Sequence, residues 1–516
     1  MLGYVWQLLL DTSFSWIRMF AALGFSVLIG LAIGIYAAIN QKAEKIVMPI
    51  VDILQTLPIL AFFPFVIYVI VTALPGYIGI NAAVIFLIIT SMLWNIIFGV
   101  YEAVKTLPKE YEELADLYGM GIGSKLTKIY IPASMPKVME QSTLSWAIGL
   151  FYLVTSEIFS TSNASYAVKH GIGVALTNLA VSGNFGQYAV GISIFIAFVV
   201  ATRLLFFAPL ERYFNRYNSQ YHYNHALAAH LKSAINRVNV AHAIAMHMPH
   251  RKRIAHAPRS YYSANEANAH NSNAAKIAYA IIIAMLVYAI FSNGALANDE
   301  IIVLEALAAS FARVWLAFAA IVAVSIPISV YLIFISRRSG WYVLLFQVIA
   351  SIPATILLPL IVLSLRNAPM HSEIAAFTIF FLSGLWYVVF SILSQKAYIS
   401  SSIFEVKKVF GVNGIRAWRK IYIYAILPGL ITGAVTGIAA EWNASIVAEY
   451  FTTSAIGSGA VITSVSTGIG KLLDISLDSG NMTLMILGLL NLTAMIIIVN
   501  RLLWKRLYGK VERVYK

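Results

Sequence analysis

Cysteine is absent from the 516 residues, and charged residues make up only 11% of them against 60% hydrophobic residues. Without cysteine the chain has neither a disulfide framework nor a thiolate metal site. Soluble domains carry about 25% charged residues, so this composition, with a mean hydropathy of +0.79, excludes an ordinary soluble protein. The N-terminal MLGYVWQLLLD lacks a basic region and a small-residue cleavage site, and we expect no cleaved signal peptide. The composition predicts an all-α, polytopic membrane protein.

Signatures of catalysis are also missing. No GxxxxGK[ST] phosphate loop occurs, because GIGKLL (Gly468 to Leu473) lacks the leading glycine and the hydroxyl residue. The apolar runs hold no paired aspartates and no His/Glu metal set. We therefore expect no enzyme, no cofactor and no metal site, and any nucleotide is expected to bind a partner chain.

Eleven apolar runs are expected to cross the bilayer, because about 20 residues of helix span its hydrocarbon core. Five precede the middle of the chain and six follow it. The expected spans are Ile17 to Ile39, Val47 to Leu74, Asn81 to Val104, Pro136 to Phe159, Tyr188 to Phe207, Lys276 to Phe291, Ile301 to Ile335, Trp341 to Leu365, Ile374 to Gln395, Pro428 to Phe451 and Met482 to Leu503.

A polar segment at residues 108–136 recurs at residues 400–428 without a gap, at an offset of 292 residues. The register pairs Glu113 with Glu405 and Gly119 with Gly411. Each copy predicts a short helix, a stop at the glycine and a second short helix, because glycine adopts a left-handed conformation cheaply. We call them the first and second elbow, and expect each to be a rigid contact for a soluble partner.

The repeat extends beyond the elbows. SEIFSTS at residues 156–162 matches AEYFTTS at 448–454, and QTLPILAFFP at 55–64 matches ASIPATILLP at 350–359. These are parallel repeats, so we expect a pore between the halves rather than within one. The expected domains are a first half at 1–210, a linker at 211–275 and a second half at 276–516.

The linker is basic, with eight Lys or Arg against two Glu, and rich in histidine. Histidine-rich tracts can chelate metals, but no cysteine or carboxylate stands at ligand spacing, so we favour a basic cytoplasmic linker. Its histidines are His222, His225, His230, His242, His247, His250, His256 and His270.

The formal charge of +14 is carried by short loops and tails between the apolar runs. That placement favours the positive-inside effect over a nucleic-acid partner. With eleven crossings, both elbows, the linker and the C-terminus lie in the cytoplasm, and the N-terminus lies outside a plasma membrane.

The spacing Glu113, Gly119, Ile129 and Pro132 resembles the Glu-Ala-Ala loop of the membrane subunits of binding-protein-dependent ABC importers. LPILAFFP and LPGLITGAVTGIAAEWNASIVAEYF (residues 427–451) resemble the nitrate/sulfonate/taurine branch. The resemblance covers both halves and implies a fused type I permease for a small anion, with two ATPase subunits and an extracytoplasmic solute-binding protein as partners. It also implies these ATPase-coupling residues: Glu113, Ala115, Gly119, Ile129, Pro132, Glu405, Gly411 and Ile421. The second copy departs from the pattern: Val406 and Lys407 replace both alanines, and Tyr424 stands where Pro132 does.

Ionisable residues at membrane depth are costly and usually face a cavity or a partner. Five residues are therefore candidates for the path or its gate: Glu157, Glu441, Trp442, Asn443 and Glu449. We expect the repeat-related Glu157 and Glu449 to gate or to pair across the interface, for example with Arg313. Lys169, His170, Arg366 and His371 are candidates to attract an anion or to meet a binding protein.

Two other classes fit less well. A secondary active transporter would also be duplicated, but it would need carboxylates for ion coupling and no elbow with a glycine stop. An intramembrane enzyme or a scaffold would leave the duplicated elbow without a role.

Overall fold

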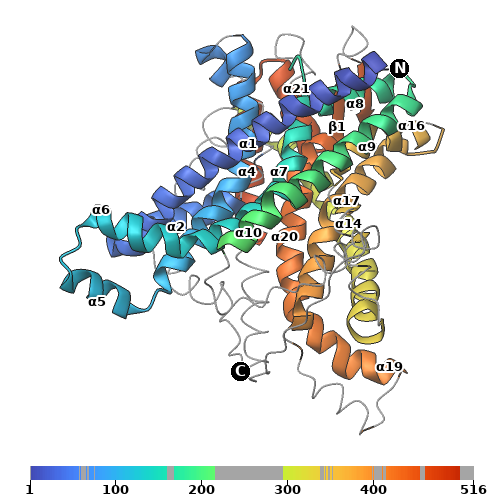
Figure 1. Ribbon diagram of the computed structural model, residues 1–516. Helices are drawn as coiled ribbons and strands as arrows, with labels where there is room; N and C mark the ends of the chain where they lie inside the picture. Colours follow the sequence, from blue (N-terminus) through green and yellow to red (C-terminus); the bar gives the residue numbers. More distant parts are fainter. Residues whose placement is uncertain are drawn as a thin grey trace.

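The computed structural model describes residues 2–56, 69–159, 168–214, 294–336, 352–397, 414–453 and 460–499, except residues 75 and 366, together with isolated positions between these ranges. Nearly all of this material is helical, as expected (Figure 1). Seven of the described helices are long and apolar enough to span a membrane. The linker from residue 215 onward and the expected span from Lys276 to Phe291 lie outside the described residues, so the count of eleven crossings stays a prediction.

The first half is built on three long helices that pack side by side, α1, α4 and α7. Helix α1 begins at Leu2, well before the expected Ile17, and the additional turns bury the polar side chains of Asp11, Thr12 and Ser15. The elements of the first half are α1 (Leu2–Ile39), α2 (Gln41–Thr56), α4 (Tyr77–Lys105), α5 (Lys109–Leu117), α6 (Ile122–Lys125), η1 (Leu126–Tyr130), α7 (Ile131–Phe159), α8 (Ile172–Val181), α9 (Phe185–Thr202), η3 (Arg203–Phe207) and α10 (Ala208–Phe214).

The second half repeats this arrangement, with α14, α17 and α20 in the places of α1, α4 and α7. Its elements are α14 (Gly294–Val330), η5 (Tyr331–Ile335), α16 (Ala354–Leu365), α17 (His371–Ser394), η6 (Gln395–Ala397), α19 (Gly414–Ala417), η7 (Trp418–Tyr422), α20 (Ile423–Glu449), β1 (Tyr450–Thr453), β2 (Ala460–Ser464), α21 (Ile469–Asp478) and α22 (Met482–Val499).

Three features of the chain differ from expectation. The spans expected to begin at Pro136 and Pro428 begin earlier, at Ile131 and Ile423, with the prolines inside the helices. Each is preceded by one π-helical turn, η1 or η7, at repeat-related positions. Two short helices, α8 and α21, lie between the expected spans.

A small antiparallel hairpin, β1 with β2, is the exception to the all-α pattern in the described chain. It follows α20, in a stretch where the offset between the two halves rises from 292 residues at Glu449 to 297 residues at Gly468. The second half is therefore five residues longer than the first half between these two positions.

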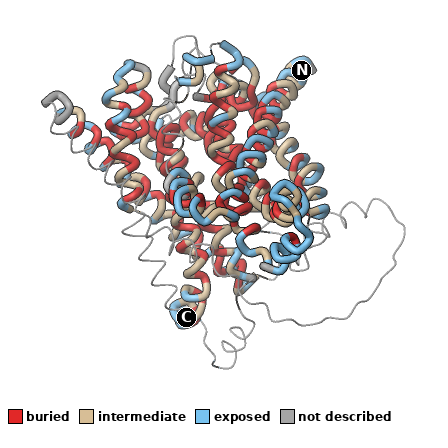
Figure 2. The backbone as a smooth tube through the Cα atoms, turned by 90° about the vertical axis from the view of Figure 1, so that its left-hand side faces the viewer, coloured by how far each residue is buried: buried red, intermediate tan, exposed pale blue. Residues whose placement is uncertain are grey.

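Buried apolar side chains run through the long helices of both halves (Figure 2). The halves meet where α16 packs against α7 and α8. At this contact the buried hydroxyl of Tyr188 in α9 donates a hydrogen bond to the backbone carbonyl of Ile356 in α16.

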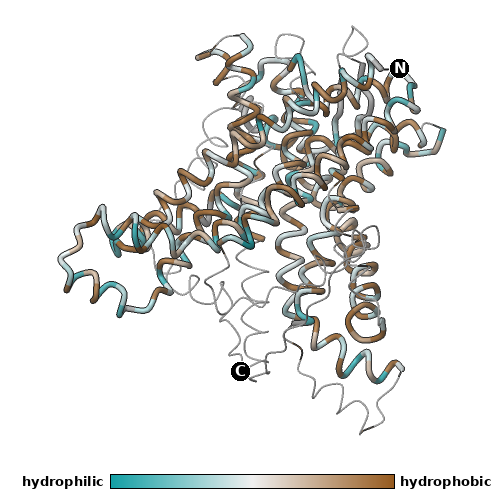
Figure 3. The backbone as a smooth tube through the Cα atoms, in the orientation of Figure 1, coloured by the Kyte–Doolittle hydropathy of each residue, from teal (hydrophilic) through white to brown (hydrophobic). Residues whose placement is uncertain are grey.

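The first elbow and the described part of the second elbow both lie away from the end that holds the N-terminus. In Figure 1, α5 and α6 project to the left and α19 lies at the lower right, whereas the N-terminus, α8 and α21 lie at the upper end. Figure 3 shows that the elbow around α5 and α6 is mostly polar, in contrast to the apolar long helices above it. That both elbows face the same side of the membrane stays a prediction.

Candidate functional site

The first elbow ends helix α5 at the expected glycine. Gly119 has φ +64°. Its N–H donates to the Asp116 carbonyl at 3.0 Å, and the N–H of Met120 donates to the Ala115 carbonyl at 2.9 Å. Together these bonds form a Schellman motif, which needs a left-handed residue at this position. The predicted glycine stop is confirmed, while Pro108 lies one position earlier than expected, at the N-cap of α5.

Two side-chain contacts fix the angle between the arms of this elbow. Tyr130 donates a hydrogen bond to Glu112 Oε1 at 3.0 Å, and Lys125 Nζ lies 2.5 Å from Asp116 Oδ1. Burial, with a smaller contribution from Glu112, raises the pKa of Tyr130 to about 12. The Tyr130 hydroxyl therefore remains a donor at neutral pH, and the elbow is held as one rigid piece.

The outer surface of the first elbow carries large apolar side chains in solvent. Leu117 is 82% exposed and Tyr118 is 80% exposed. The other members of this surface are Tyr111, Leu114 and Ile122. Exposed apolar patches of this kind indicate a protein contact.

The expected coupling residues of the first elbow divide between this surface and the interior. Glu113 and Pro132 are exposed, Ile129 is half-buried and Ala115 is buried. Ala115 therefore supports the elbow from inside rather than contacting a partner.

The second elbow is described only in part, and Glu405 and Gly411 lie outside the described residues. Its exposed apolar residues include Phe410 and Ile415, and Ile421 is half-buried. Tyr422, the counterpart of Tyr130, stacks on Phe334 with ring centroids 4.4 Å apart. The same KIYI sequence is thus anchored by different contacts in the two halves.

At the opposite end of α7, Glu157 lies in a buried cluster of polar groups that we call the first clamp (Ser15, Arg18 and Glu157). Glu157 Oε1 accepts hydrogen bonds from Ser15 Oγ at 2.6 Å and Arg18 Nη1 at 2.7 Å. Its Oε2 accepts from the backbone N–H of Gly173 at 2.9 Å, and Ser15 Oγ accepts from the N–H of Ile172 at 2.9 Å. The clamp thus joins α1 and α7 to the start of α8.

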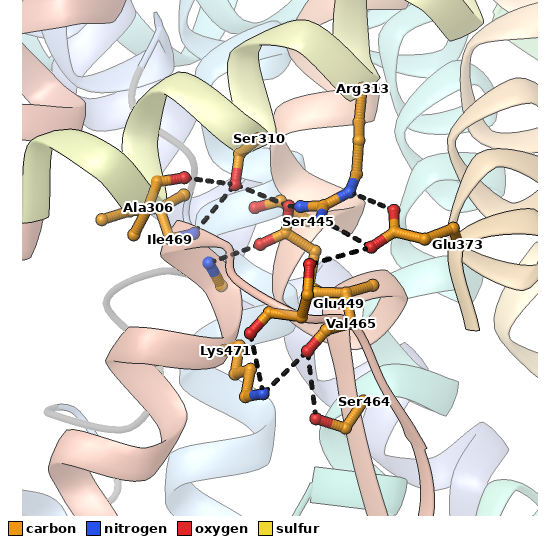
Figure 4. A network of polar contacts seen from close by, with 12 residues as sticks. Ala306, Ser310, Arg313, Glu373, Ser445, Glu449, Ser464, Val465, Ile469 and Lys471 are labelled. Carbon is orange, nitrogen blue, oxygen red and sulfur yellow. Dashed lines mark hydrogen bonds and ion pairs between the residues drawn. The ribbon is translucent and has the colours of Figure 1, made fainter. Parts of the chain in front are cut away.

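The second half contains the same arrangement, the second clamp (Ser310, Arg313 and Glu449; Figure 4). Glu449 Oε1 accepts from Ser310 Oγ at 2.6 Å and from Arg313 Nη1 at 3.1 Å. Glu449 Oε2 accepts from the N–H of Gly470 at 2.8 Å, and Ser310 Oγ accepts from the N–H of Ile469 at 2.8 Å. Glu157 and Glu449 therefore pair within their own halves and not across the interface, because their arginines lie on neighbouring helices of the same bundle.

Each clamp caps the N-terminus of a short helix with side chains that belong to other helices. The first N–H groups of a helix have no partner within it, and the N-cap residues of α8 and α21 are Gly171 and Gly468, which carry no side chain. The serine and glutamate of each clamp accept these N–H groups instead. A Cβ added at Gly171 would lie 2.6 Å from Glu157 Cδ, and one at Gly468 would lie 2.3 Å from Glu449 Oε2, so glycine lets the carboxylate approach.

The clamps differ in charge. Arg18 also donates to Asn81 Oδ1 at 2.8 Å and to the His170 carbonyl at 2.7 Å. The counterpart of Asn81 is Glu373, which binds Arg313 through two hydrogen bonds of 2.6 and 2.8 Å. With every carboxyl ionised, the first clamp is neutral, whereas the second clamp with Glu373 has one excess negative charge.

The three remaining gate candidates lie on α20. Glu441 is fully buried, and neither of its carboxyl oxygens has a hydrogen-bond partner among the described residues. Trp442 is 4% exposed, and half-buried Asn443 donates to the Ala439 carbonyl at 2.9 Å. Within the described residues, no group of three or more histidine or carboxylate side chains could hold a metal ion.

Sequence reasoning missed the clamp serines, Arg18 and the short helices. A signal was present, because Gly171-Ile172-Gly173 recurs as Gly468-Ile469-Gly470, 297 residues later. Ser15 and Arg18 likewise recur as Ser310 and Arg313, 295 residues later. Comparing the repeats at several offsets would have found both.

Comparison with known proteins gives the family. The chain matches the binding-protein-dependent transport system inner membrane component family twice, at residues 30–216 and 334–508. Similar proteins include the bicarbonate transport system permease protein CmpB of Synechococcus elongatus, 29% identical over 134 residues, or 26% of this chain and 45% of that protein. The nitrate import permease protein NrtB of Leptolyngbya laminosa is 27% identical over 124 residues, or 24% of this chain and 41% of that protein.

A third similar protein is the glycine betaine/proline betaine transport system permease protein ProW of Salmonella typhimurium, 28% identical over 165 residues, or 32% of this chain and 45% of that protein. The chain thus spans less than half the length of each of these relatives. The two matches of the family together cover more than half of the chain, and they include both elbows and the carboxylates of both clamps. The chain belongs to the family of binding-protein-dependent transport system inner membrane components.

Proposed function

We propose that this chain is a fused permease that forms the transmembrane path of an ATP-driven importer. The observation that carries the proposal is the presence of two repeat-related elbows on a duplicated helical body, both away from the end that holds the N-terminus (Figure 1). The first elbow is a rigid unit with a glycine stop and an exposed apolar surface. Such a unit transmits a push from a soluble subunit to the helices behind it.

In this mechanism two separate ATPase subunits dock on the elbows from the cytoplasm, and their closure rocks the two halves of the plasma-membrane protein. An extracytoplasmic solute-binding protein delivers the solute at the opposite end, where the clamps lie. The N-terminus is then outside and the C-terminus inside. Each clamp ties a short helix to a spanning helix, so that the two move together when its half rocks.

For the solute, we propose a small anion, because the similar proteins include nitrate and bicarbonate permeases. Lys169 and His170, beside the first clamp, are candidates to attract it. Glu157 and Glu449 are engaged with arginine and with helix N-termini, so their role in the path is to position helices rather than to contact the solute.

A betaine is the second candidate solute, since similar proteins also include a betaine permease. Arg18 and Arg313 are paired with carboxylates, so these arginines do not distinguish the two solutes, and the uptake experiment decides between them.

The test is uptake into proteoliposomes that contain this chain, with the ATPase subunits and the solute-binding protein of the same importer. We expect uptake of labelled nitrate or bicarbonate only with internal ATP and ATPase. Uptake of glycine betaine alone would replace the anion proposal, and uptake driven by an ion gradient without ATPase would indicate a secondary transporter.

A further inference from the structure

At one contact between two helices, the large and the small residue have swapped places between the first half and the second half. In the first half, Gly149 of α7 faces Met92 of α4, and a Cβ at Gly149 would lie 2.2 Å from Met92 Cε. The residues 292 positions later are Glu441 of α20 and Gly384 of α17. A Cβ at Gly384 would lie 2.8 Å from Glu441 Oε1. The glutamate therefore fills, from the opposite helix, the space that a methionine fills in the first half.

The surroundings of Glu441 are apolar. The same added Cβ on Gly384 would lie 2.7 Å from Ile321 Cδ1 of α14. One turn before Glu441, Gly437 packs closely on the backbone of Gly384. Glu441 is 0% exposed, and both of its oxygens lack a hydrogen-bond partner in the described part of the chain.

The charged and titratable groups on the elements that pack against α20 do not neutralise Glu441. Arg313 of α14 binds Glu373 and Glu449, and Lys471 of α21 donates to the Val465 and Ser466 carbonyls. None of the described groups forms an ion pair with Glu441. The others on the described parts of these elements are Asp299, Glu300 and Glu305 of α14, His371 and Tyr387 of α17, Tyr450 of β1, Asp474 of α21, Lys396 of η6, and Arg419, Lys420 and Tyr422 of η7.

An ionised carboxylate in such a place loses its hydration and gains no partner, which costs several kcal/mol. The neutral acid avoids that cost, and its single O–H can donate to a nearby helix carbonyl, as Ser and Thr hydroxyls do in helices. The packing exchange supports the neutral form independently, because a carboxyl takes the place of an uncharged thioether.

We propose that Glu441 is a proton-binding site: it is packed against Gly384 as a neutral carboxylic acid and releases its proton only when water reaches the α17–α20 contact. On release, the O–H bond breaks, the electron pair stays on the carboxylate and the proton passes to water. The second half then carries a charge that the first half does not have, and closing the contact again requires a proton. This goes beyond the proposed transport function and does not depend on it.

Infrared difference spectroscopy of the purified chain in lipid nanodiscs tests the site without any ATPase. At neutral pH, the wild-type minus Glu441→Gln spectrum should contain the carbonyl-stretch band of a protonated carboxyl, shifted in heavy water. Glu305→Gln, on an exposed part of α14, should not remove that band. A Glu441→Gln variant that loses only the bands of an ionised carboxylate would overturn the proposal.

A pH series of thermal unfolding gives a second readout. Because the fold favours the neutral acid, the stability that it contributes is present at low pH and lost as pH rises. The melting temperature of wild type should therefore fall relative to that of Glu441→Gln as pH rises above the range in which an unfolded glutamate ionises. The double variant Gly384→Met/Glu441→Gly copies the residues of the first half. Its melting temperature should depend on pH as little as that of Glu441→Gln. If the melting temperatures of all three proteins changed equally with pH, the proposal would be contradicted.

Discussion

Gly119 ends α5 because its backbone has a positive φ of +64°, a region that side chains with a Cβ occupy at a cost of about 1–2 kcal/mol. The space around it is open, since no heavy atom lies within 4 Å of an added Cβ. Conformation alone therefore sets the requirement for glycine here. Because a helix stop is a local property, this residue could be predicted from the sequence.

We predict that Gly119→Val abolishes ATP-dependent uptake but leaves membrane insertion and the rest of the fold intact. The matched control is Gly121→Val, since Gly121 is also open but has φ −67°, which valine adopts freely. Uptake by proteoliposomes and thermal unfolding measure the two effects. Equal uptake by the two variants would contradict a role for the elbow angle.

Glu441, in contrast to Gly119, has an environment that the sequence alone does not reveal. A buried glutamate could be flagged from its place in an apolar run, but its environment could not be predicted, because it depends on Gly384, 57 residues away on another helix. The predicted gate role of Glu157 and Glu449 stays a prediction, and their pairing within each half depends likewise on arginines more than 130 residues distant.

The short helices α8 and α21 were missed because nothing in their own sequence announces a helix start. An N-cap serine, threonine or aspartate is the usual local signal, and glycine stands at that position in both. Their caps come from serine and glutamate on other helices, and ten residues are too few to span a membrane. Capping in trans is a tertiary contact, which a local pattern does not encode.

We predict that Ser15→Ala and Ser310→Ala each destabilise the protein by about 1 kcal/mol, the usual effect of losing a helix cap. The double variant should show the sum, because the clamps lie in different halves and share no partner. Ser13→Ala is the control, since Ser13 bonds only within its own helix, to the Leu9 carbonyl. Thermal unfolding in nanodiscs measures the effect, and equal shifts for Ser13→Ala and Ser15→Ala would contradict trans capping.

We also predict that Tyr188→Phe weakens the contact between the halves. It removes the hydrogen bond that the buried Tyr188 hydroxyl donates to the Ile356 carbonyl, and a hydrogen bond of this kind contributes about 0.5–1.5 kcal/mol. Tyr4→Phe is the control, because the buried Tyr4 hydroxyl has no hydrogen-bond partner in the described residues. If the two variants lower the melting temperature equally, Tyr188 does not tie the halves together.

The two halves are copies that have diverged in their polar groups while keeping their helices. Three second-half carboxylates, Glu300, Glu373 and Glu441, stand where the aligned first-half residues are Val5, Asn81 and Gly149. The duplication and the helical class could be predicted because matching motifs and long apolar runs are visible in the sequence. The β1–β2 hairpin could not be predicted, since its strands pair through backbone hydrogen bonds that no motif in the sequence marks.

The account rests on two elbows that face the same compartment, and site-directed thiol labelling measures this directly. The chain has no cysteine, so Tyr118→Cys and Phe410→Cys, both highly exposed, can each be tested against a clean background. Ser182→Cys, after α8, reports on the opposite end. With a membrane-impermeant maleimide, we expect both elbow variants to react in inside-out vesicles and only Ser182→Cys to react in right-side-out vesicles. Labelling of the two elbows from opposite faces of the membrane would contradict the account.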